Sequence, residues 1–128
     1  VDDDALVLMN TAALLDDLGH EVIEAFSGAD ALAKFRARED IDLLITDQAM
    51  PNMTGIQLVS AIEEIRPGMP VIIASGYGEG LEVPGRSVER LGKPFDQDRL
   101  AQAIAKVMEG GGIFGEPARK QQAVGSAR

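Results

Sequence analysis

A short apolar run that ends in a carboxylate constrains the fold of this chain more than any other feature. Residues 41 to 47 read Ile-Asp-Leu-Leu-Ile-Thr-Asp, and a Met-Pro-Asn-Met-Thr-Gly segment follows at residues 50 to 55. An apolar, β-branched run of this length, bounded by turn residues, is typical of a buried strand. The sequence therefore predicts a strand that delivers Asp47 to a loop at its carboxyl end, where open α/β sheets bind ligands.

Helical and strand patterns alternate along the rest of the chain. Asp4 can cap the first helix and Gly19 can end it. Four glycines and a proline between residues 76 and 85 favour a loop or a short irregular turn there. Such alternation predicts a parallel sheet with helices on both faces. The expected helices cover residues 6–18, 28–38, 56–66 and 96–109, and the expected strands cover 21–25, 41–47, 71–74 and 87–91.

Length and composition fit one small domain. The chain has 128 residues, 45% of them hydrophobic, which is enough for a single core. From Gly110 onward three consecutive glycines and several polar residues predict a flexible tail or linker. We therefore expect a domain over residues 1–109 and a tail over 110–128. The absence of cysteine excludes disulfides and thiolate metal sites.

The net charge of −9 argues against direct contact with nucleic acid, because phosphate contacts need clustered lysine and arginine. Most of the 21 acidic residues are expected to form a solvated surface. No apolar run approaches the length of about 18 residues that a membrane span requires, and no basic and apolar leader is present. The sequence therefore predicts a cytoplasmic protein without a membrane partner.

Three carboxylates form the centre of the predicted site. If Val1 ends a parallel strand beside the one that ends at Asp47, then Asp2 and Asp3 lie next to Asp47. Mg²⁺ is usually held by one or two carboxylates together with phosphate oxygens and water. Asp47 with such a cation beside it can act as a nucleophile and form an acyl phosphate.

Two further strand ends supply the groups that such chemistry needs. Lys93, before Pro94, is a mobile cation that can pair with Asp47 or with a phosphoryl oxygen. Ser75 ends the strand of residues 71–74 and can donate a hydroxyl hydrogen bond to the same oxygen. Each residue alone is commonplace, but their arrangement at successive strand ends makes a chance agreement improbable.

This combination resembles the receiver domain of bacterial two-component response regulators, over residues 1 to 109. The resemblance rests on Asp2 and Asp3, on Asp47 with the loop that follows it, on Ser75 and on Lys93-Pro94. It implies a flavodoxin-like, doubly wound parallel sheet of order 2-1-3-4-5. It also implies that Asp47 accepts a phosphoryl group from a phosphohistidine.

The resemblance further assigns roles to individual residues. Mg²⁺ would be held by the two amino-terminal acids and Asp47 with the backbone carbonyl of Ala49, and Lys93 would pair with the phosphate. Ser75 would be the switch hydroxyl. Tyr77 and Arg90 would belong to the switch and output region, and Arg90 stands where many receivers carry a switching aromatic residue.

Two departures from the family pattern bear on the fold and the output. Of the first strand of the family only Val1 remains, so that this strand is expected to be largely missing here. The glycine-rich segment after Ser75 resembles receivers of hybrid histidine kinases, in which the fourth helix is short or irregular.

The partner is expected to be a histidine kinase or a histidine phosphotransfer protein, with fusion to a kinase in the full gene as one arrangement. Leu8, Ala12 and Leu15 form a second apolar stripe on the first helix. The stripe is either extra core or an exposed docking surface for that partner.

The sequence as a whole predicts a phosphoacceptor domain that switches its affinity for a partner. It is not expected to be an enzyme beyond self-catalysed phosphoryl transfer and hydrolysis of the acyl phosphate. Two alternatives stay open. One is a pseudo-receiver that binds partners without phosphorylation. The other is a phosphatase similar to haloacid dehalogenases, although such enzymes need a second aspartate two residues after the nucleophile, where this chain has Ala49.

Overall fold

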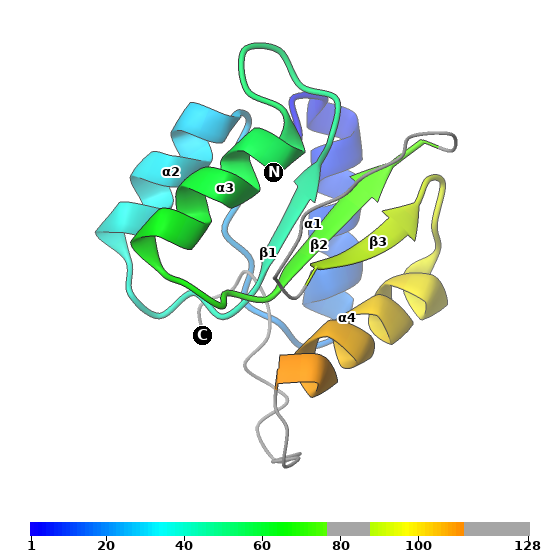
Figure 1. Ribbon diagram of the computed structural model, residues 1–128. Helices are drawn as coiled ribbons and strands as arrows, with labels where there is room; N and C mark the ends of the chain where they lie inside the picture. Colours follow the sequence, from blue (N-terminus) through cyan, green and yellow to red (C-terminus); the bar gives the residue numbers. More distant parts are fainter. Residues whose placement is uncertain (77–87, 112–128) are drawn as a thin grey trace.

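The computed structural model of the protein describes residues 1–76 and 88–111. Most of the glycine-rich segment, with Tyr77, and most of the expected tail therefore lie outside the described residues. Helices and strands alternate as the sequence predicts, apart from one strand discussed below (Figure 1). The elements in chain order are α1 (Ala5–Asp17), α2 (Gly28–Ala37), β1 (Leu44–Asp47), α3 (Gly55–Ile65), β2 (Val71–Ser75), β3 (Val88–Gly92) and α4 (Gln97–Gly111).

The three described strands form a parallel sheet in the order β1-β2-β3. The register pairs Asp47 with Ala74, and Ser75 with Gly92. The carboxyl ends of all three strands therefore meet at one edge of the sheet. This order agrees with the last three positions of the predicted 2-1-3-4-5 sheet, and the fold is the flavodoxin-like, doubly wound α/β fold that the sequence predicts.

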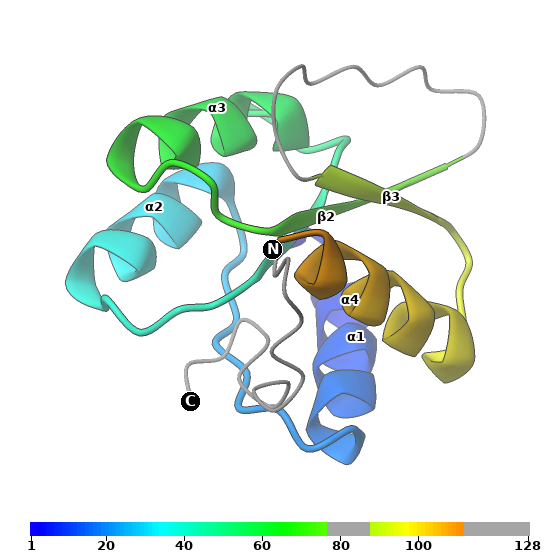
Figure 2. The same cartoon turned by 60° about the horizontal axis from the view of Figure 1, so that its bottom comes forward.

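Helices cover both faces of the sheet (Figure 2). On one face, α2 and α3 pack against β1 and β2 through a core cluster that includes Phe35, Leu58 and Ile73. On the other face, α1 and α4 pack against all three strands through Leu15, Leu100 and their neighbours. Strand residues alternate between the two clusters, because successive side chains of a strand point to opposite faces.

The helices begin where local capping signals place them. The Asp4 side chain accepts hydrogen bonds from the backbone N–H groups of Leu6 and Val7, which confirms its predicted role as a cap. Ser27 caps α2 by accepting from the Asp30 N–H. Thr54 and Gln57 form a capping box at the start of α3.

The predicted strand over residues 21–25 is wrong, since the structure assigns no strand there. A strand is defined by the ladder it shares with a neighbour, and the neighbour here consists of Val1 and Asp2. The Asp2 N–H donates to the Ala25 carbonyl at 3.1 Å, and the Asp47 N–H donates to the Val1 carbonyl at 2.9 Å. These two residues lie between Ala25 and β1 in the place of the expected first strand. They are too short a neighbour for residues 21–25 to form a ladder with.

Gly55 lets the loop after Asp47 fold back closely onto the end of β1. Its N–H donates to the Gln48 carbonyl at 3.0 Å. A Cβ added at Gly55 would lie 2.5 Å from the backbone carbonyl oxygen of Asp47 and 3.0 Å from the Cα of Gln48. Backbone atoms cannot move aside as a flexible side chain can, so that this position requires glycine.

We expect Gly55→Ala to lower the free energy of unfolding by about 2 kcal/mol, as overpacking does in other cores. Urea unfolding followed by circular dichroism measures the change. Gly92→Ala is the matched control, because a Cβ at Gly92 meets no atom of the described part of the chain within 4 Å. Equal stability of the two variants would show that the close approach of the loop imposes no cost.

Candidate functional site

Three carboxylates gather at the carboxyl edge of the sheet. Oxygen atoms of Asp2, Asp3 and Asp47 all lie within 4.8 Å of one another. Asp2 and Asp47 are each 7% exposed, whereas Asp3 is exposed to solvent. The backbone bond from Asp47 to the Val1 carbonyl holds the amino-terminal acids beside the end of β1. The cluster that the sequence predicts is therefore present.

Lys93 is the cation that faces these acids. Its Nζ lies 2.7 Å from Asp47 Oδ1, to which it donates a hydrogen bond, and 3.6 Å from Asp2 Oδ2. The Lys93 N–H donates to the Ser75 carbonyl at 2.9 Å, which ties the segment after β3 to the end of β2. The peptide bond between Lys93 and Pro94 is cis. The structure thus joins Lys93 and Asp47, which are 46 residues apart in the sequence.

The electrostatic environment shifts the proton affinity of the Lys93 amino group. Burial by itself lowers the pKa of Lys93, but the hydrogen bond and the attraction to Asp47, with a further contribution from Asp2, outweigh it and raise the pKa above the ordinary 10.5. Lys93 therefore stays protonated near neutral pH and serves as a permanent positive charge.

The residues fit a divalent cation. Carboxylate oxygens are the hard ligands that Mg²⁺ takes, and two oxygens on one octahedral Mg²⁺ lie about 3 to 4 Å apart. The three carboxylates are within a small movement of that spacing. They carry three negative charges against the single positive charge of Lys93, so that a cation would relieve the remaining repulsion. Asp2, Asp3 and Asp47 are thus the side chains that could hold the metal.

Ser75 lies where the sequence predicts, at the carboxyl end of β2, and is 8% exposed. The next residue, Gly76, is exposed, and a Cβ added there would meet no atom of the described residues within 4 Å. Ser75 and Asp47 thus end neighbouring parallel strands at the same edge of the sheet.

The position of Gln48 was not anticipated from the sequence. Its side-chain Oε1 accepts a hydrogen bond from the Ile56 N–H at 2.9 Å, and its backbone carbonyl accepts from Gly55. Gln48, which directly follows Asp47, is thus hydrogen-bonded to the start of α3. A polar residue directly after Asp47 and seven positions before the first residue of α3 is the signal that could have suggested it.

The structure does not test the predicted roles of the other site residues. Ala49 lies two residues after Asp47 and is exposed, and its role as a carbonyl ligand stays a prediction. Arg90 is an exposed residue of β3, in register with Ile73. Tyr77 lies outside the described residues. The switch role of Arg90 and Tyr77 therefore also stays a prediction.

The docking stripe predicted on the first helix belongs to the core. Leu8 is 5% exposed and Leu15 is 4% exposed, and Ala12 is half-buried between them. All three line the space between α1 and β1. The alternative of extra core, which the sequence left open, is confirmed. The large apolar side chains that α1 does expose are Leu6 and Met9.

Comparison with known proteins agrees with this geometry. Residues 1–105 match the protein family described as the response regulator receiver domain. The chain belongs to this family. Receiver domains act in two-component signal transduction, and the acidic cluster and Lys93 of this receiver lie inside the matched residues. Among the described residues no helix is long and apolar enough to cross a membrane.

Relatives and solved structures are similar over most of this receiver. Transcriptional regulatory protein GlrR of Escherichia coli is 38% identical over 113 residues, which cover 85% of this chain and 25% of that protein. Sensor kinase CckA of Brucella abortus is 29% identical, over 85% of this chain and 12% of that protein. A receiver domain protein from Clostridium thermocellum superposes with a TM-score of 0.71 at 32% identity, over 85% of this chain and 90% of the other. The chain spans about a quarter of the length of the first curated relatives.

The raised pKa of Lys93 predicts a loss of stability at alkaline pH. Because the folded state holds this proton more tightly than the unfolded chain, the contribution is complete below a pH of about 10.5 and is lost as the pH rises through the raised pKa of the folded state. Lys93→Met should therefore flatten the decline of the free energy of unfolding above a pH of about 10.5, measured by urea titrations. Lys106→Met, which removes an exposed lysine 3.5 Å from Glu89, is the control and should keep the decline. If the free energy of unfolding of Lys93→Met declined as steeply above this pH as that of the parent chain, the decline could not be assigned to the Lys93 proton.

Proposed function

We propose that this receiver domain accepts a phosphoryl group on Asp47 from a phosphohistidine, with Mg²⁺ bound, and that the modification changes its affinity for a partner. The observation that carries the proposal is the contact of Asp47 with Lys93 beside two further carboxylates at a strand edge. This arrangement combines a nucleophile, a fixed cation and a set of oxygen ligands. The family relationship supports the same function.

Each group of the site has a separate role in the proposed phosphoryl transfer. A carboxylate oxygen of Asp47 attacks the phosphorus, the phosphorus–nitrogen bond breaks, and the histidine nitrogen keeps the electron pair. Mg²⁺, when bound, neutralises charge on the phosphoryl oxygens. Lys93, already 2.7 Å from Asp47, can turn from the carboxylate to a phosphoryl oxygen. Transfer of this kind depends on positioning and charge more than on acid–base groups.

Hydrolysis and output follow from the same groups. Water attack on the acyl phosphate would return Asp47 to its free form, so that we propose self-catalysed turnover and no separate enzymatic activity. The Ser75 hydroxyl, at the end of the strand beside β1, can donate a hydrogen bond to the phosphoryl group. Movement of Ser75 and Lys93 toward the phosphate would then alter the surface around the ends of β2 and β3.

The phosphodonor is proposed to be a histidine kinase or a histidine phosphotransfer protein. One similar protein is itself a sensor kinase by name, whereas others are transcriptional regulatory proteins. We expected no contact with nucleic acid. The names of the transcriptional relatives do not support that expectation for the whole protein. The acidic charge of this receiver still favours protein contacts for the domain itself. We propose a cytoplasmic location, where such donors act on soluble receivers.

The acidic cluster and Lys93 also distinguish the proposed function from the two alternative functions. A pseudo-receiver has no need to retain a buried Asp47 bonded to Lys93 with Asp2 at 3.6 Å from the same ammonium. A phosphatase similar to haloacid dehalogenases needs a second acid where this chain has Ala49, and the family match is to receivers. Phosphorylation of the purified chain distinguishes all three.

Asp47→Asn should abolish labelling by acetyl phosphate in the presence of Mg²⁺, because an amide oxygen is not a nucleophile for phosphorus. Labelling is measured by intact-protein mass spectrometry as an added phosphoryl group. Asp98→Asn, which changes an exposed acid in the first turn of α4, is the control and should be labelled as the parent chain is. Undiminished labelling of Asp47→Asn would reject the acceptor. Absence of labelling in the parent chain would favour the pseudo-receiver.

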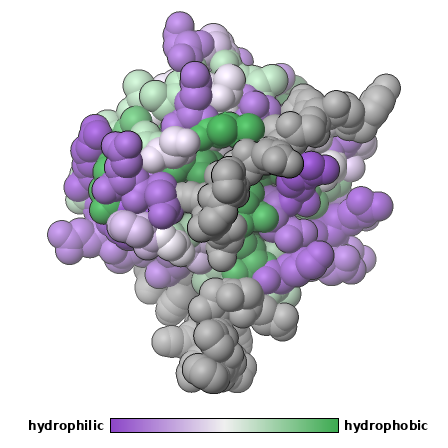
Figure 3. All heavy atoms as spheres, viewed as in Figure 1, coloured by the Kyte–Doolittle hydropathy of each residue, from purple (hydrophilic) through white to green (hydrophobic). Residues whose placement is uncertain are grey.

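A docking surface for the donor can be proposed from the residues that α1 exposes. Leu6 is 70% exposed and Met9 is 60% exposed, and their spacing places them on one face of α1. Phe26, which is 50% exposed, follows Ala25, and Ala25 is bonded to Asp2. Leu6 and Met9 thus belong to the helix that follows Asp2 and Asp3, and Phe26 follows the residue that the Asp2 N–H contacts. Hydrophilic residues dominate the outer surface of α2 and α3 in the view of Figure 3.

We expect the double variant Leu6→Glu, Met9→Glu to reduce the rate of transfer from a phosphorylated donor protein at least tenfold, since each charge would be placed in an apolar contact. Labelling by acetyl phosphate should be unchanged, because neither side chain belongs to the acidic cluster. Ile65→Glu is the matched control, because Ile65 is 38% exposed and is the last residue of α3. Equal transfer to all three proteins would place the donor elsewhere.

A further inference from the structure

Gln48 completes the amino-terminal end of α3 from outside that helix. The first N–H groups of an α-helix have no acceptor within the helix itself. In α3 the Gly55 N–H donates to the Gln48 carbonyl at 3.0 Å, and the Ile56 N–H donates to Gln48 Oε1 at 2.9 Å. The third N–H, that of Gln57, donates to Thr54 Oγ1 at 3.2 Å. Two of the first three donors of α3 are therefore bonded to Gln48, which directly follows β1.

Gln48 is also bonded to the sheet. Its N–H donates to the Ala74 carbonyl at 3.1 Å, which extends the hydrogen bonds between β1 and β2 by one residue beyond Asp47. The N–H, the carbonyl and the side-chain oxygen of this one residue are thus all engaged, the first with β2 and the other two with α3. Such a residue has little freedom in its own backbone. The peptide group that Gln48 shares with Ala49 is fixed as a result.

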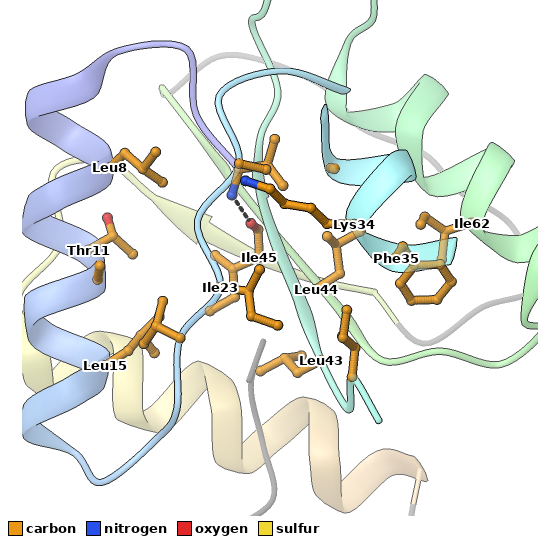
Figure 4. Close-up of a pocket in the computed structure, with 16 residues that line it drawn as sticks. Leu8, Thr11, Leu15, Ile23, Lys34, Phe35, Leu43, Leu44, Ile45 and Ile62 are labelled. Carbon is orange, nitrogen blue, oxygen red and sulfur yellow. Dashed lines mark hydrogen bonds between the residues drawn. The ribbon is translucent and has the colours of Figure 1, made fainter. Parts of the chain in front are cut away.

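The strand before Gln48 is a rigid base for these contacts. In Figure 4, Leu44 lies on the side of β1 that faces Phe35 and Ile62, which belong to the same core cluster. Leu43 is fully buried in the cluster on the opposite face. Close packing on both faces leaves β1 little room to move. The part of the chain next to Asp47 that can move is therefore the loop that follows it.

The loop of residues 49–54 is closed at its base by Gln48. Ala49, Pro51 and Asn52 are exposed, and Asn52 has a φ of 66°, in the left-handed region. The carbonyl bond to Gly55 is open to any residue at position 48. The bond from Oε1, in contrast, requires a side chain with an acceptor at this reach. The second closure of the loop therefore depends on the identity of this residue.

Gln48 stands between two groups that the predicted cation site would take from this part of the chain. Asp47 precedes it, and Ala49, whose carbonyl is the predicted backbone ligand, follows it. Groups that hold metal ligands in place without touching the metal contribute to its affinity. Gln48 is uncharged, so that it can do this without adding to the three negative charges of the acidic cluster.

We propose that Gln48 is a positioning residue of the cation site, whose side-chain bond to α3 holds Asp47 and the Ala49 carbonyl in the arrangement that binds Mg²⁺. This role rests on the proposed function, because it concerns the cation which that function requires. Gln48 acts through its neighbours and does not touch the metal or the phosphoryl group. Its loss therefore changes the affinity for Mg²⁺ and leaves the nucleophile intact.

Gln48→Met keeps the length of the side chain and removes the acceptor oxygen. The dissociation constant for Mg²⁺, measured on the 128-residue chain from amide chemical shifts, should rise about tenfold. Gln57→Met is the matched control, because Gln57 Oε1 also accepts one backbone N–H at this end of α3, that of Thr54 at 3.0 Å. Both variants should lower the urea midpoint of unfolding, but Gln57→Met should leave the dissociation constant unchanged. An equal loss of Mg²⁺ affinity in both would make Gln48 only a helix cap and would overturn the proposal.

Gln48→Glu tests the acceptor oxygen from the opposite direction. A carboxylate accepts the same N–H, favourably at a helix amino terminus, so that this variant should bind Mg²⁺ at least as tightly as the parent chain. Weaker binding would contradict the role of the acceptor.

Labelling by acetyl phosphate separates affinity from chemistry. Gln48→Met should need more Mg²⁺ for half-maximal labelling and should reach the rate of the parent chain at saturation. A lower rate at saturation with an unchanged Mg²⁺ requirement would overturn the proposal. A parent chain that binds no Mg²⁺ would contradict this role and the proposed function together. Normal labelling of the parent chain with equal Mg²⁺ affinity in all variants would contradict the role of Gln48 alone.

Discussion

The ion pair between Lys93 and Asp47 joins the end of β1 to the segment after β3 and passes over the end of β2. Its 2.7 Å contact holds a buried carboxylate that would otherwise face only two further acids. Loss of one partner of such a pair leaves an uncompensated charge in a poorly solvated place. The parallel register makes the pair possible, because it brings the carboxyl ends of all three described strands to one edge. The acidic cluster, Ser75 and the loop that Gln48 bonds to α3 are all arranged around it.

The amino-terminal residues connect the acidic cluster to β1 and to Ala25. Val1 contributes two backbone bonds to β1, and Asp2 contributes one to Ala25 and a carboxylate to the acidic cluster. The acidic cluster and the sheet are in this way parts of one hydrogen-bonded arrangement.

The sequence predicted the helices well because their signals are local. Asp4, Ser27 and Thr54 each cap the helix that follows by bonding backbone groups within three residues, and such contacts do not depend on the rest of the fold. The strand over residues 21–25 failed for the opposite reason. Its alternating pattern was suitable, but a strand needs a neighbour, and Val1 and Asp2 are too short to provide one. The alternating pattern of one segment carries no information on whether a neighbouring strand is present.

The stripe of Leu8, Ala12 and Leu15 shows the same limit on a helix. Spacing placed the three residues on one side of α1, but whether that side met the sheet or the solvent depended on how α1 packs, which involves residues far away in the sequence. Leu6 and Met9 are comparably apolar and yet exposed. Hydrophobicity alone therefore could not separate core from surface on this helix.

The sequence by itself determined which residues make up the candidate site, because Asp2, Asp3, Asp47, Ser75 and Lys93 each stand at the end of a predicted element in a fixed order along the chain. It also determined the fold class, since alternating helical and strand patterns permit few arrangements other than a parallel sheet. The tertiary structure decided how close these groups come and which apolar side chains are buried. Distances, burial and cavities arise from contacts between distant segments, whose free energies depend on all the partners at once.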